Sequence, residues 1–257
     1  MHYREIAPSP ELSHLIWSFW EFRVDERAPG PLRHEVFPDG CISIFYFANR
    51  RYDFAGIGCS GLIKENWVTE VLPGNLYWGV RVAPAACAQV FDADPARLQR
   101  GPEFENPRLT AGILEEMNNC AGIDQAIVIY EDRFESLGIA LSQLDSKVVE
   151  AVETIEETKG NTKIAEIAEM IGLSTRHLQR SFRRSTGLTP KQFTRARRFR
   201  ATAVSMVEDA GLNWAQRAAE FGFTDQAHLN HEFSSVTGRS PNSFAEKVGE
   251  IDHGDLV

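Results

Sequence analysis

The chain has 257 residues, which is enough for two domains or one large one, and its hydrophobic fraction of 43% suits ordinary globular cores. Its formal net charge of −9 would argue against a nucleic-acid partner if the charge were evenly spread. It is not, because residues 1–146 carry 12 Lys and Arg against 21 Asp and Glu, whereas residues 147–247 carry 15 against 12. Residues 170–207 hold nine basic side chains and no acidic one. The net charge therefore does not exclude nucleic-acid binding by residues 147–247.

The cysteine and hydropathy patterns exclude further classes of protein. Cys41, Cys59, Cys87 and Cys120 show no CxxC spacing, so the patterns typical of zinc ribbons and redox pairs are missing. No apolar run approaches the roughly 18 residues of a membrane span, and residues 1–10 lack the apolar core of a signal peptide. We therefore expect a cytoplasmic protein with reduced thiols, no membrane association and no cofactor.

Residues 11–110 contain short apolar and aromatic runs broken by Pro and Gly, which predicts β-structure. The expected strands span residues 15–22, 41–48, 54–59, 68–72 and 77–82. Turns are expected at residues 38–40 and 73–75, short helices at 84–90 and 95–100, and two further helices within 109–134. The many aromatic residues in the strands favour a sandwich or a small barrel.

Residues 164–244 contain one pattern written twice. The first copy runs through Ala168, Gly172, Leu178, Phe182, Gly187, Pro190 and Phe193. The second runs through Ala218, Gly222, Leu229, Phe233, Gly238, Pro241 and Phe244. In each copy, apolar residues at helical spacing on both sides of a glycine predict a helix, a tight turn and a second helix. This is the layout of a DNA-binding helix-turn-helix unit, whose second helix enters the major groove.

Capping signals place the ends of these helices. Thr162 and Ser174 are N-cap candidates in the first copy, where the first helix should end near Ile171. Thr189 and Pro190 should open a connecting helix that reaches about residue 206. In the second copy, Asn213 should cap the first helix, the second should span about 225–235, and Ser240 and Pro241 should start a final helix.

The spaced double motif carries a family resemblance. Its matching residues are Gly222, Phe223, Leu229, Phe233, Gly238, Ser240, Pro241 and Phe244, which resemble the signature of the AraC/XylS family of transcription regulators. The first copy resembles the upstream partner of that signature. The resemblance implies an α+β fold of two domains. Residues 1–142 would form a cupin-like β-barrel with flanking helices. This domain would sense an effector or mediate dimerisation of the protein. Residues 143–249 would form an all-α DNA-binding domain, and residues 250–257 an acidic tail.

Within residues 143–249 the resemblance implies helix-turn-helix units at about 162–184 and 213–235, joined by a linker helix. It places base contacts at Arg176, Gln179 and Arg180 in the first unit, and at Gln226 and His231 in the second. Arginine suits guanine and glutamine suits adenine in the major groove. An exposed helix face that contacts only phosphates is the alternative. The phosphate contacts that we expect are Thr175, Arg183, Arg184, Lys191 and Arg195.

The second unit departs from the family pattern, because residues 208–247 carry three basic side chains against six acidic ones. Many family members have Arg or Lys near the positions of His231 and Glu232. We therefore expect the second unit to hold DNA less tightly or to read fewer bases. His228 and His231 lie three residues apart, but no third ligand is spaced to complete a metal site.

Two readings of the N-terminal region stay open at this point. Trp17, Phe19, Phe45, Phe47 and Tyr77 could line an effector pocket inside the barrel, or they could form a packed core. Cys41 or Cys59 could be a reactive sensor thiol, or both could be buried and inert.

Together these features predict a sequence-specific DNA-binding transcription regulator, and not an enzyme, whose partner is double-stranded DNA. We expect a small-molecule effector in the N-terminal domain, RNA polymerase as a further partner if the protein activates transcription, and a homodimer. The alternatives are a ligand-independent dimeric DNA-binding protein and a cysteine-based DNA-repair or redox-sensing regulator.

Overall fold

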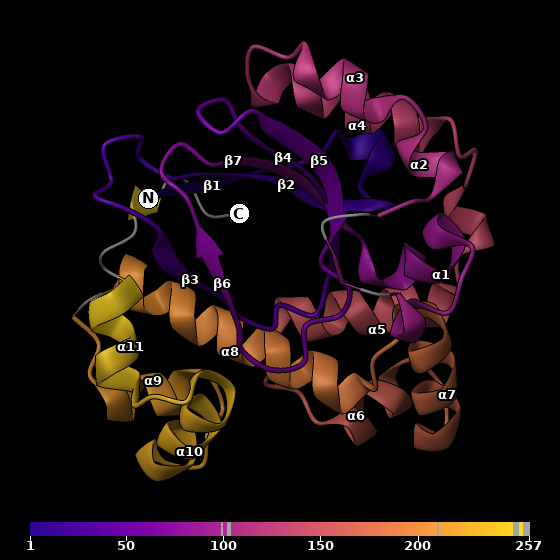
Figure 1. Ribbon diagram of the computed structural model, residues 1–257. Helices are drawn as coiled ribbons and strands as arrows, with labels where there is room; N and C mark the ends of the chain where they lie inside the picture. The colour runs from indigo at the N-terminus through magenta and orange to yellow at the C-terminus, as the bar shows by residue number, and fades with distance from the viewer. Residues whose placement is uncertain (99, 102–103, 210, 249–251, 254–257) are drawn as a thin grey trace.

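The computed structural model describes residues 1–98, 100–101, 104–209, 211–248 and 252–253, and Figure 1 shows its arrangement. Within these residues the N-terminal half forms a six-stranded sheet of order β5-β4-β7-β2-β1-β8 and a separate two-stranded sheet, β3-β6. The strands are β1 His2–Ile6, β2 Ile16–Arg23, β3 Leu32–Val36, β4 Ile42–Asn49, β5 Phe54–Cys59, β6 Trp67–Val71, β7 Leu76–Val82 and β8 Asp252–His253. All neighbours pair antiparallel except β1 and β8.

Each of the five strands expected from the sequence is present, with ends within one residue of the prediction. β1 and β3 were not predicted, because their sequences, HYREI and LRHEV, are rich in charged residues and lack a continuous apolar run. β3 pairs with β6, with two strands between them in the chain, whereas β1 pairs with the next strand, β2. The α+β class is confirmed, and the β-structure consists of two facing sheets.

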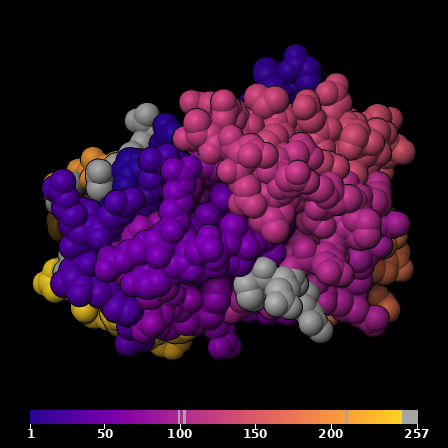
Figure 2. Space-filling view, turned by 45° about the horizontal axis from the view of Figure 1, so that its top comes forward, coloured from indigo at the N-terminus to yellow at the C-terminus, as the bar shows by residue number. Residues whose placement is uncertain are grey.

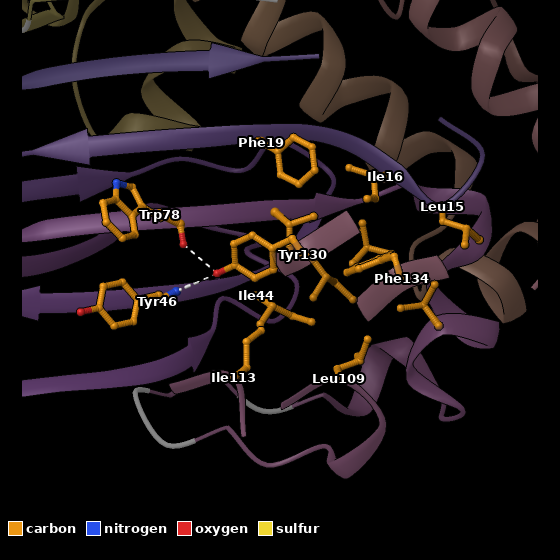
Figure 3. Packing of buried hydrophobic residues seen from close by; sticks show 14 of the residues in the cluster. Leu15, Ile16, Phe19, Ile44, Tyr46, Trp78, Leu109, Ile113, Tyr130 and Phe134 are labelled. Atoms are coloured by element: carbon orange, nitrogen blue, oxygen red, sulfur yellow. Dashed lines mark hydrogen bonds between the residues drawn. The ribbon is translucent and has the colours of Figure 1, made fainter. Parts of the chain in front are cut away.

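Helices cover one face of the six-stranded sheet. They are α1 Cys87–Phe91, α2 Pro107–Thr110, α3 Ile113–Asn118 and α4 Ile123–Glu135, with single 3-10 turns η1 Pro10–Leu12, η2 Pro84–Ala86, η3 Pro95–Arg97 and η4 Leu141–Gln143. The buried residues of α4 recur at three- and four-residue steps, which directs one stripe at the sheet. Tyr130 on that stripe donates to the Trp78 carbonyl and accepts from the Tyr46 amide, so it fixes α4 on β4 and β7 (Figure 3).

The C-terminal half is helical. Its elements are α5 Ser146–Glu157, α6 Ile164–Met170, α7 Thr175–Thr186, α8 Pro190–Glu208, α9 Trp214–Glu220, α10 Gln226–Thr237 and α11 Pro241–Val248. Ser174, Thr189 and Asn213 cap α7, α8 and α9 with their side chains, as predicted. The prediction that Thr162 caps α6 was wrong. The N-cap residue is Lys163, the next residue in the chain, and its side chain makes no capping hydrogen bond.

The two repeated units lie along α8, on its side remote from the six-stranded sheet (Figure 1). α6 and α7 pack with the first half of α8 through Phe182 and Phe193, whereas α9 to α11 pack with the second half through Phe199, Phe233 and Phe244. The face in Figure 2 is formed mainly by the first half of the chain, and the yellow C-terminal helices emerge only at its edge. None of the described helices combines the length and the apolarity that a bilayer span requires.

Candidate nucleic-acid interface

The first unit presents its second helix, α7, as an amphipathic reading element. Leu178 and Phe182 are fully buried, while Arg176, Gln179 and Arg180 are all exposed on the other side. The turn before α7 contains Gly172 at φ +70°, a left-handed conformation that favours glycine. Capping by Ser174 then starts α7 directly after the turn, with Thr175 exposed in its first turn. The three predicted base-reading residues of this unit therefore share one solvent-facing surface.

The cations around α7 are largely uncompensated. Arg176, Arg180, Arg183 and Lys191 are exposed and form no ion pair within the part of the chain that the structure describes. Arg184 lies 3.3 Å from a carboxylate oxygen of Asp145, but its side chain remains 71% exposed, so solvent screens the pair. This surface is therefore a concentrated positive patch that can attract a phosphate backbone.

The arginines of α8 are mostly engaged in contacts within the protein. Arg195 and Arg198 both contact the Glu232 carboxylate of α10 at 3.4 Å. Arg197 binds the Glu156 carboxylate and donates to the Asp39 carbonyl at 3.0 Å. The structure thus places Arg195, a predicted phosphate contact, in an ion pair between α8 and α10.

The second unit presents a different reading surface. Gln226 and His231 are exposed on α10, as expected for base contacts. Glu232 points toward α8 and is paired there, so its charge is compensated within the protein. His228 accepts from the Thr224 amide at 3.1 Å. Arg217 is 3% exposed and donates to Ser205, so it is buried away from any DNA. This unit offers few cations to DNA, in agreement with its sequence.

The first unit docks on the N-terminal domain through apolar and backbone contacts. α7 packs against η2, α1 and η3. Gly187, the C-cap of α7, lies so close that an added Cβ would come within 2.7 Å of the Ala96 nitrogen and 2.6 Å of a Leu62 methyl. Leu188 is buried in the same core as Ala85 of η2. The first unit and the N-terminal domain therefore share one continuous core.

The second unit contacts β3 through an ion pair and an aromatic ring. Arg239 donates to both carboxylate oxygens of Glu35 on β3, one bond measuring 2.9 Å. The Glu35 side chain is only 3% exposed, against 25% for Arg239. The Phe37 ring, two residues further, lies 5.7 Å from that of Phe199 and 5.1 Å from that of Phe244. β3 therefore reaches the core of the second unit.

Contact between the two units themselves is limited. Lys159 lies over the Phe221 ring at 5.5 Å, and Asn161 of the same loop abuts Gly222. Beside these contacts is a cavity of about 330 Å³, whose lining includes Glu156, Val204, Leu212 and Glu220. Close packing is thus interrupted between α5, α8 and α9.

A buried charge cluster joins α8 to the six-stranded sheet. Glu5 of β1 lies 2.9 Å from Arg81 and 2.8 Å from Arg200. Burial alone would raise the pKa of Glu5, but the two guanidinium groups hold that pKa below its ordinary value. Arg81 also contacts Asp39 at 2.8 Å. The cluster is therefore compensated, and it ties the middle of α8 to the N-terminal domain.

Aromatic rings gather on the sheet face opposite the helices. Trp20, Phe45, Phe47 and Tyr77 lie within 6.5 Å of one another in successive ring contacts and are each partly exposed. Three rings lie against glycines of neighbouring strands: an added Cβ would approach Trp20 to 2.1 Å at Gly79, Phe45 to 2.6 Å at Gly58 and Phe47 to 2.5 Å at Gly56. The rings with their glycines form what we term the aromatic surface.

Two of the five predicted pocket residues do not belong to the aromatic surface. Phe19 is fully buried on the other face, where its ring stacks near Tyr130 (Figure 3). Strand alternation explains the difference, since Phe19 and Trp20 are adjacent in β2 and point to opposite faces. Trp17 lies beside the bulge between Ile16 and Ser18, and its ring contacts Arg197 of α8 at 5.3 Å. Trp20, which was not predicted, belongs to the surface instead.

The cysteine side chains are all buried. Burial, with a smaller contribution from Asp39, raises the pKa of Cys41 to about 12, and burial raises that of Cys59 to about 11. Thiolates, which are the reactive form, are therefore disfavoured at both sites.

Sequence reasoning did not find Glu35, Phe37 or Arg239, because the Glu35–Arg239 pair joins residues 204 positions apart and leaves no local pattern. Gly56 and Gly58 did offer a signal. Two glycines at alternate positions of a strand indicate close approach by a neighbouring side chain.

Comparison with known proteins agrees with this geometry. Residues 167–247 match the family model HTH_18, a helix-turn-helix domain, and residues 4–101 match a domain of unknown function, DUF6597. The chain is 25% identical over 212 residues to the Msm operon regulatory protein of Streptococcus mutans, covering 80% of this chain and 73% of that protein.

Two solved structures illustrate the range of structural likeness. A transcriptional regulator with an AraC-type DNA-binding domain from Chromobacterium violaceum is 20% identical, covers 40% of this chain and 91% of its own, and gives a TM-score of 0.36. ToxT from Vibrio cholerae is 11% identical, covers 89% of this chain and 97% of its own, and gives a TM-score of 0.44.

The paired helix-turn-helix units, the matched domain and the regulatory relative define a DNA-binding transcription regulator. The helix-turn-helix domain at residues 167–247 is of the AraC type.

Proposed function

We propose that this regulator reads a specific duplex sequence chiefly through α7. The observation that carries the proposal is the shared exposed face of Arg176, Gln179 and Arg180, which no acidic side chain pairs with in the described structure. Arginine and glutamine at the N-terminal half of a recognition helix match the donor and acceptor pattern of guanine and adenine in the major groove. The neighbouring cations supply the sequence-independent attraction on which such reading depends.

We propose phosphate contacts around the same helix. Thr175 and Lys191 lie at the starts of α7 and α8, where exposed groups can meet the backbone on either side of the groove, and Arg183 lies on the exposed side of α7. Arg184 can exchange its exposed Asp145 partner for a phosphate. Arg195 would have to leave Glu232 first, so its contribution is the smallest.

In the second unit we propose Gln226 and His231 as the base contacts. They are exposed on α10, but the few cations around them give this helix less electrostatic support than α7 has. The second unit therefore adds specificity more than affinity.

We further propose that the aromatic surface binds a small-molecule effector. Trp20, Phe45 and Tyr77 lie on inner strands of the sheet, where side chains are usually covered, yet all three remain partly exposed. Partly exposed rings that pack against glycines can contact an apolar ligand. The two helix-turn-helix units would have two arrangements, and the effector would favour the arrangement in which the protein binds it more tightly. RNA polymerase and a second copy of the chain are further proposed partners.

Selection of bound duplexes from a random pool tests the DNA assignment. The intact protein should select a motif of two half-sites separated by about one helical turn, or roughly 10 bp. Arg176→Ala should relax one position in the first half-site, and Gln226→Ala one position in the second. If Gln226→Ala left the motif unchanged, α10 would not read bases through this residue. If both variants left it unchanged, the proposal would be contradicted.

Native mass spectrometry of the protein from cell extract, followed by thermal shift against a metabolite library, tests the effector. A bound compound whose stabilising shift is lost with Phe45→Leu supports the aromatic surface. Persistent absence of any bound compound favours a ligand-independent dimeric regulator. The cysteine-based alternative has less support, because the buried thiols have raised pKa values.

A further inference from the structure

The N-terminal domain contacts both readers at the same position of the internal repeat. In the first unit, Gly187 ends α7 and is followed by Leu188. In the second, Gly238 ends α10 and is followed by Arg239. Leu188 is buried in a core shared with the N-terminal domain, and Arg239 binds Glu35 of that domain. The N-terminal domain thus bridges the two units, in addition to the covalent connection through α8.

The two ends of this bridge differ in strength. The first end is apolar and includes backbone contacts of Gly187, so it can shift only if the packed core opens. The second end depends on one bidentate ion pair and the Phe37 ring. An Arg–carboxylate pair of this kind fixes direction as well as distance, because both partners are planar. Glu35 can therefore hold the second unit in one orientation.

Other restraints on that orientation lie away from this ion pair: β8, which follows α11, pairs with β1, and Arg200 of α8 binds Glu5 of the same strand. The units touch each other through Lys159 and Asn161, and the cavity of about 330 Å³ lies beside this contact. α8 is a single helix of 19 residues that packs with the first unit through its first half and with the second unit through its second half. Arg198 and Arg195 join Glu232 to α8, but those contacts lie within the second half of the bundle.

We infer that Glu35 is a positioning residue for DNA recognition: through Arg239 it sets the orientation of the second unit relative to the first, and so the spacing of half-sites that the protein accepts. This inference rests on the proposed reading of DNA by both units. Glu35 itself contacts no DNA. Its neighbour His34 faces the other way and stacks on Phe22 at 4.4 Å between ring centroids, so β3 lies between the aromatic face of the sheet and the second unit.

The test measures affinity as a function of half-site spacing. The duplex selected from the random pool is remade with zero, one, two, three and five base pairs inserted between its half-sites. Five base pairs rotate the second half-site by about half a turn of the duplex, away from a fixed reader. The wild-type protein should lose affinity steeply, by about tenfold at the worst spacing, because the second unit no longer engages.

Glu35→Gln and Arg239→Gln should both reduce the loss at insertions of one and two base pairs to less than about threefold, since a second unit released from β3 can shift slightly with its half-site. The double variant should match the single variants, because both remove one interaction. Arg33→Gln is the matched control: Arg33 also pairs with Glu35, at 3.8 Å, but it lies on β3 itself and is 66% exposed, so its loss leaves the link to the second unit intact and the profile should remain steep. Unfolding temperatures identify any variant that has lost its fold.

Equally steep profiles in all folded variants would overturn the inference. A uniform loss at every spacing with Arg239→Gln alone would also overturn it, since Arg239 would then contact DNA directly. A further duplex with a scrambled second half-site distinguishes failure of the proposed function from failure of the positioning role alone. If scrambling leaves wild-type affinity unchanged, the second unit reads no DNA and the proposed function fails there. If scrambling matters but the Glu35→Gln profile is steep, only the positioning role fails.

Discussion

The two helix-turn-helix units are copies of one sequence pattern, yet they differ in the surface they present and in how they are held. The first has exposed, unpaired arginines on its reading helix and a buried apolar junction with the N-terminal domain. The second has one buried arginine, an internally compensated Glu232 and a polar junction through Glu35. The comparison teaches that two copies of one fold can take different roles, the first in binding DNA strongly and the second in adjusting its position. This is possible because the residues of the buried core and those of the surface vary independently.

The largest expected effect contrasts the two helix-terminating glycines. Both Gly187 and Gly238 adopt positive φ, so alanine at either should cost about 1–2 kcal/mol of unfolding free energy. At Gly187 the new Cβ would also meet backbone atoms of Pro95 and Ala96 within 3 Å, adding about 1–3 kcal/mol of overpacking. Nothing lies within 4 Å at Gly238. Urea unfolding of Gly187→Ala and Gly238→Ala measures the difference. Equal costs would contradict the tight junction of the first unit.

The next contrast concerns base reading. Arg180→Ala should reduce affinity for the selected duplex by about 1–3 kcal/mol, since a bidentate contact to one base is lost. His231→Ala, on the equivalent face of α10, should cost clearly less, because a histidine offers no fork of donors. Fluorescence anisotropy with the labelled duplex at fixed salt compares the two. If His231→Ala cost as much as Arg180→Ala, the first unit would not dominate binding.

The smallest effect appears in the salt dependence of binding. Lys191→Gln should lower the slope of log affinity against log salt by about one, since a phosphate contact releases roughly one counterion. Arg195→Gln should leave the slope nearly unchanged, because the Arg195 charge is already compensated by Glu232. Affinities at four or more salt concentrations give both slopes. A lower slope with Arg195→Gln would mean that this side chain leaves Glu232 when DNA binds.

Local features of the chain were predictable because their causes are local. The cap at Ser174 needs only its own hydroxyl and the His177 amide three residues on, and the strand at 54–59 is bounded by nearby turn residues. Predictions became unreliable where a residue's role depends on which face it occupies. Phe19 and Trp20 are adjacent aromatics, and only the register of β2 in the sheet decides which of them lies in the core.

The amino-acid sequence by itself determined the repeated units, their turns and the basic character of the first reader, since helix periodicity, capping and charge are properties of neighbouring residues. Only the tertiary structure decided which cations are free and what holds each unit. Lys191 and Arg195 look alike in the sequence, but Arg195 meets Glu232 from another helix, and Glu35 meets Arg239 from another domain. Those pairings arise from three-dimensional packing, which brings together residues whose separation along the chain carries no signal.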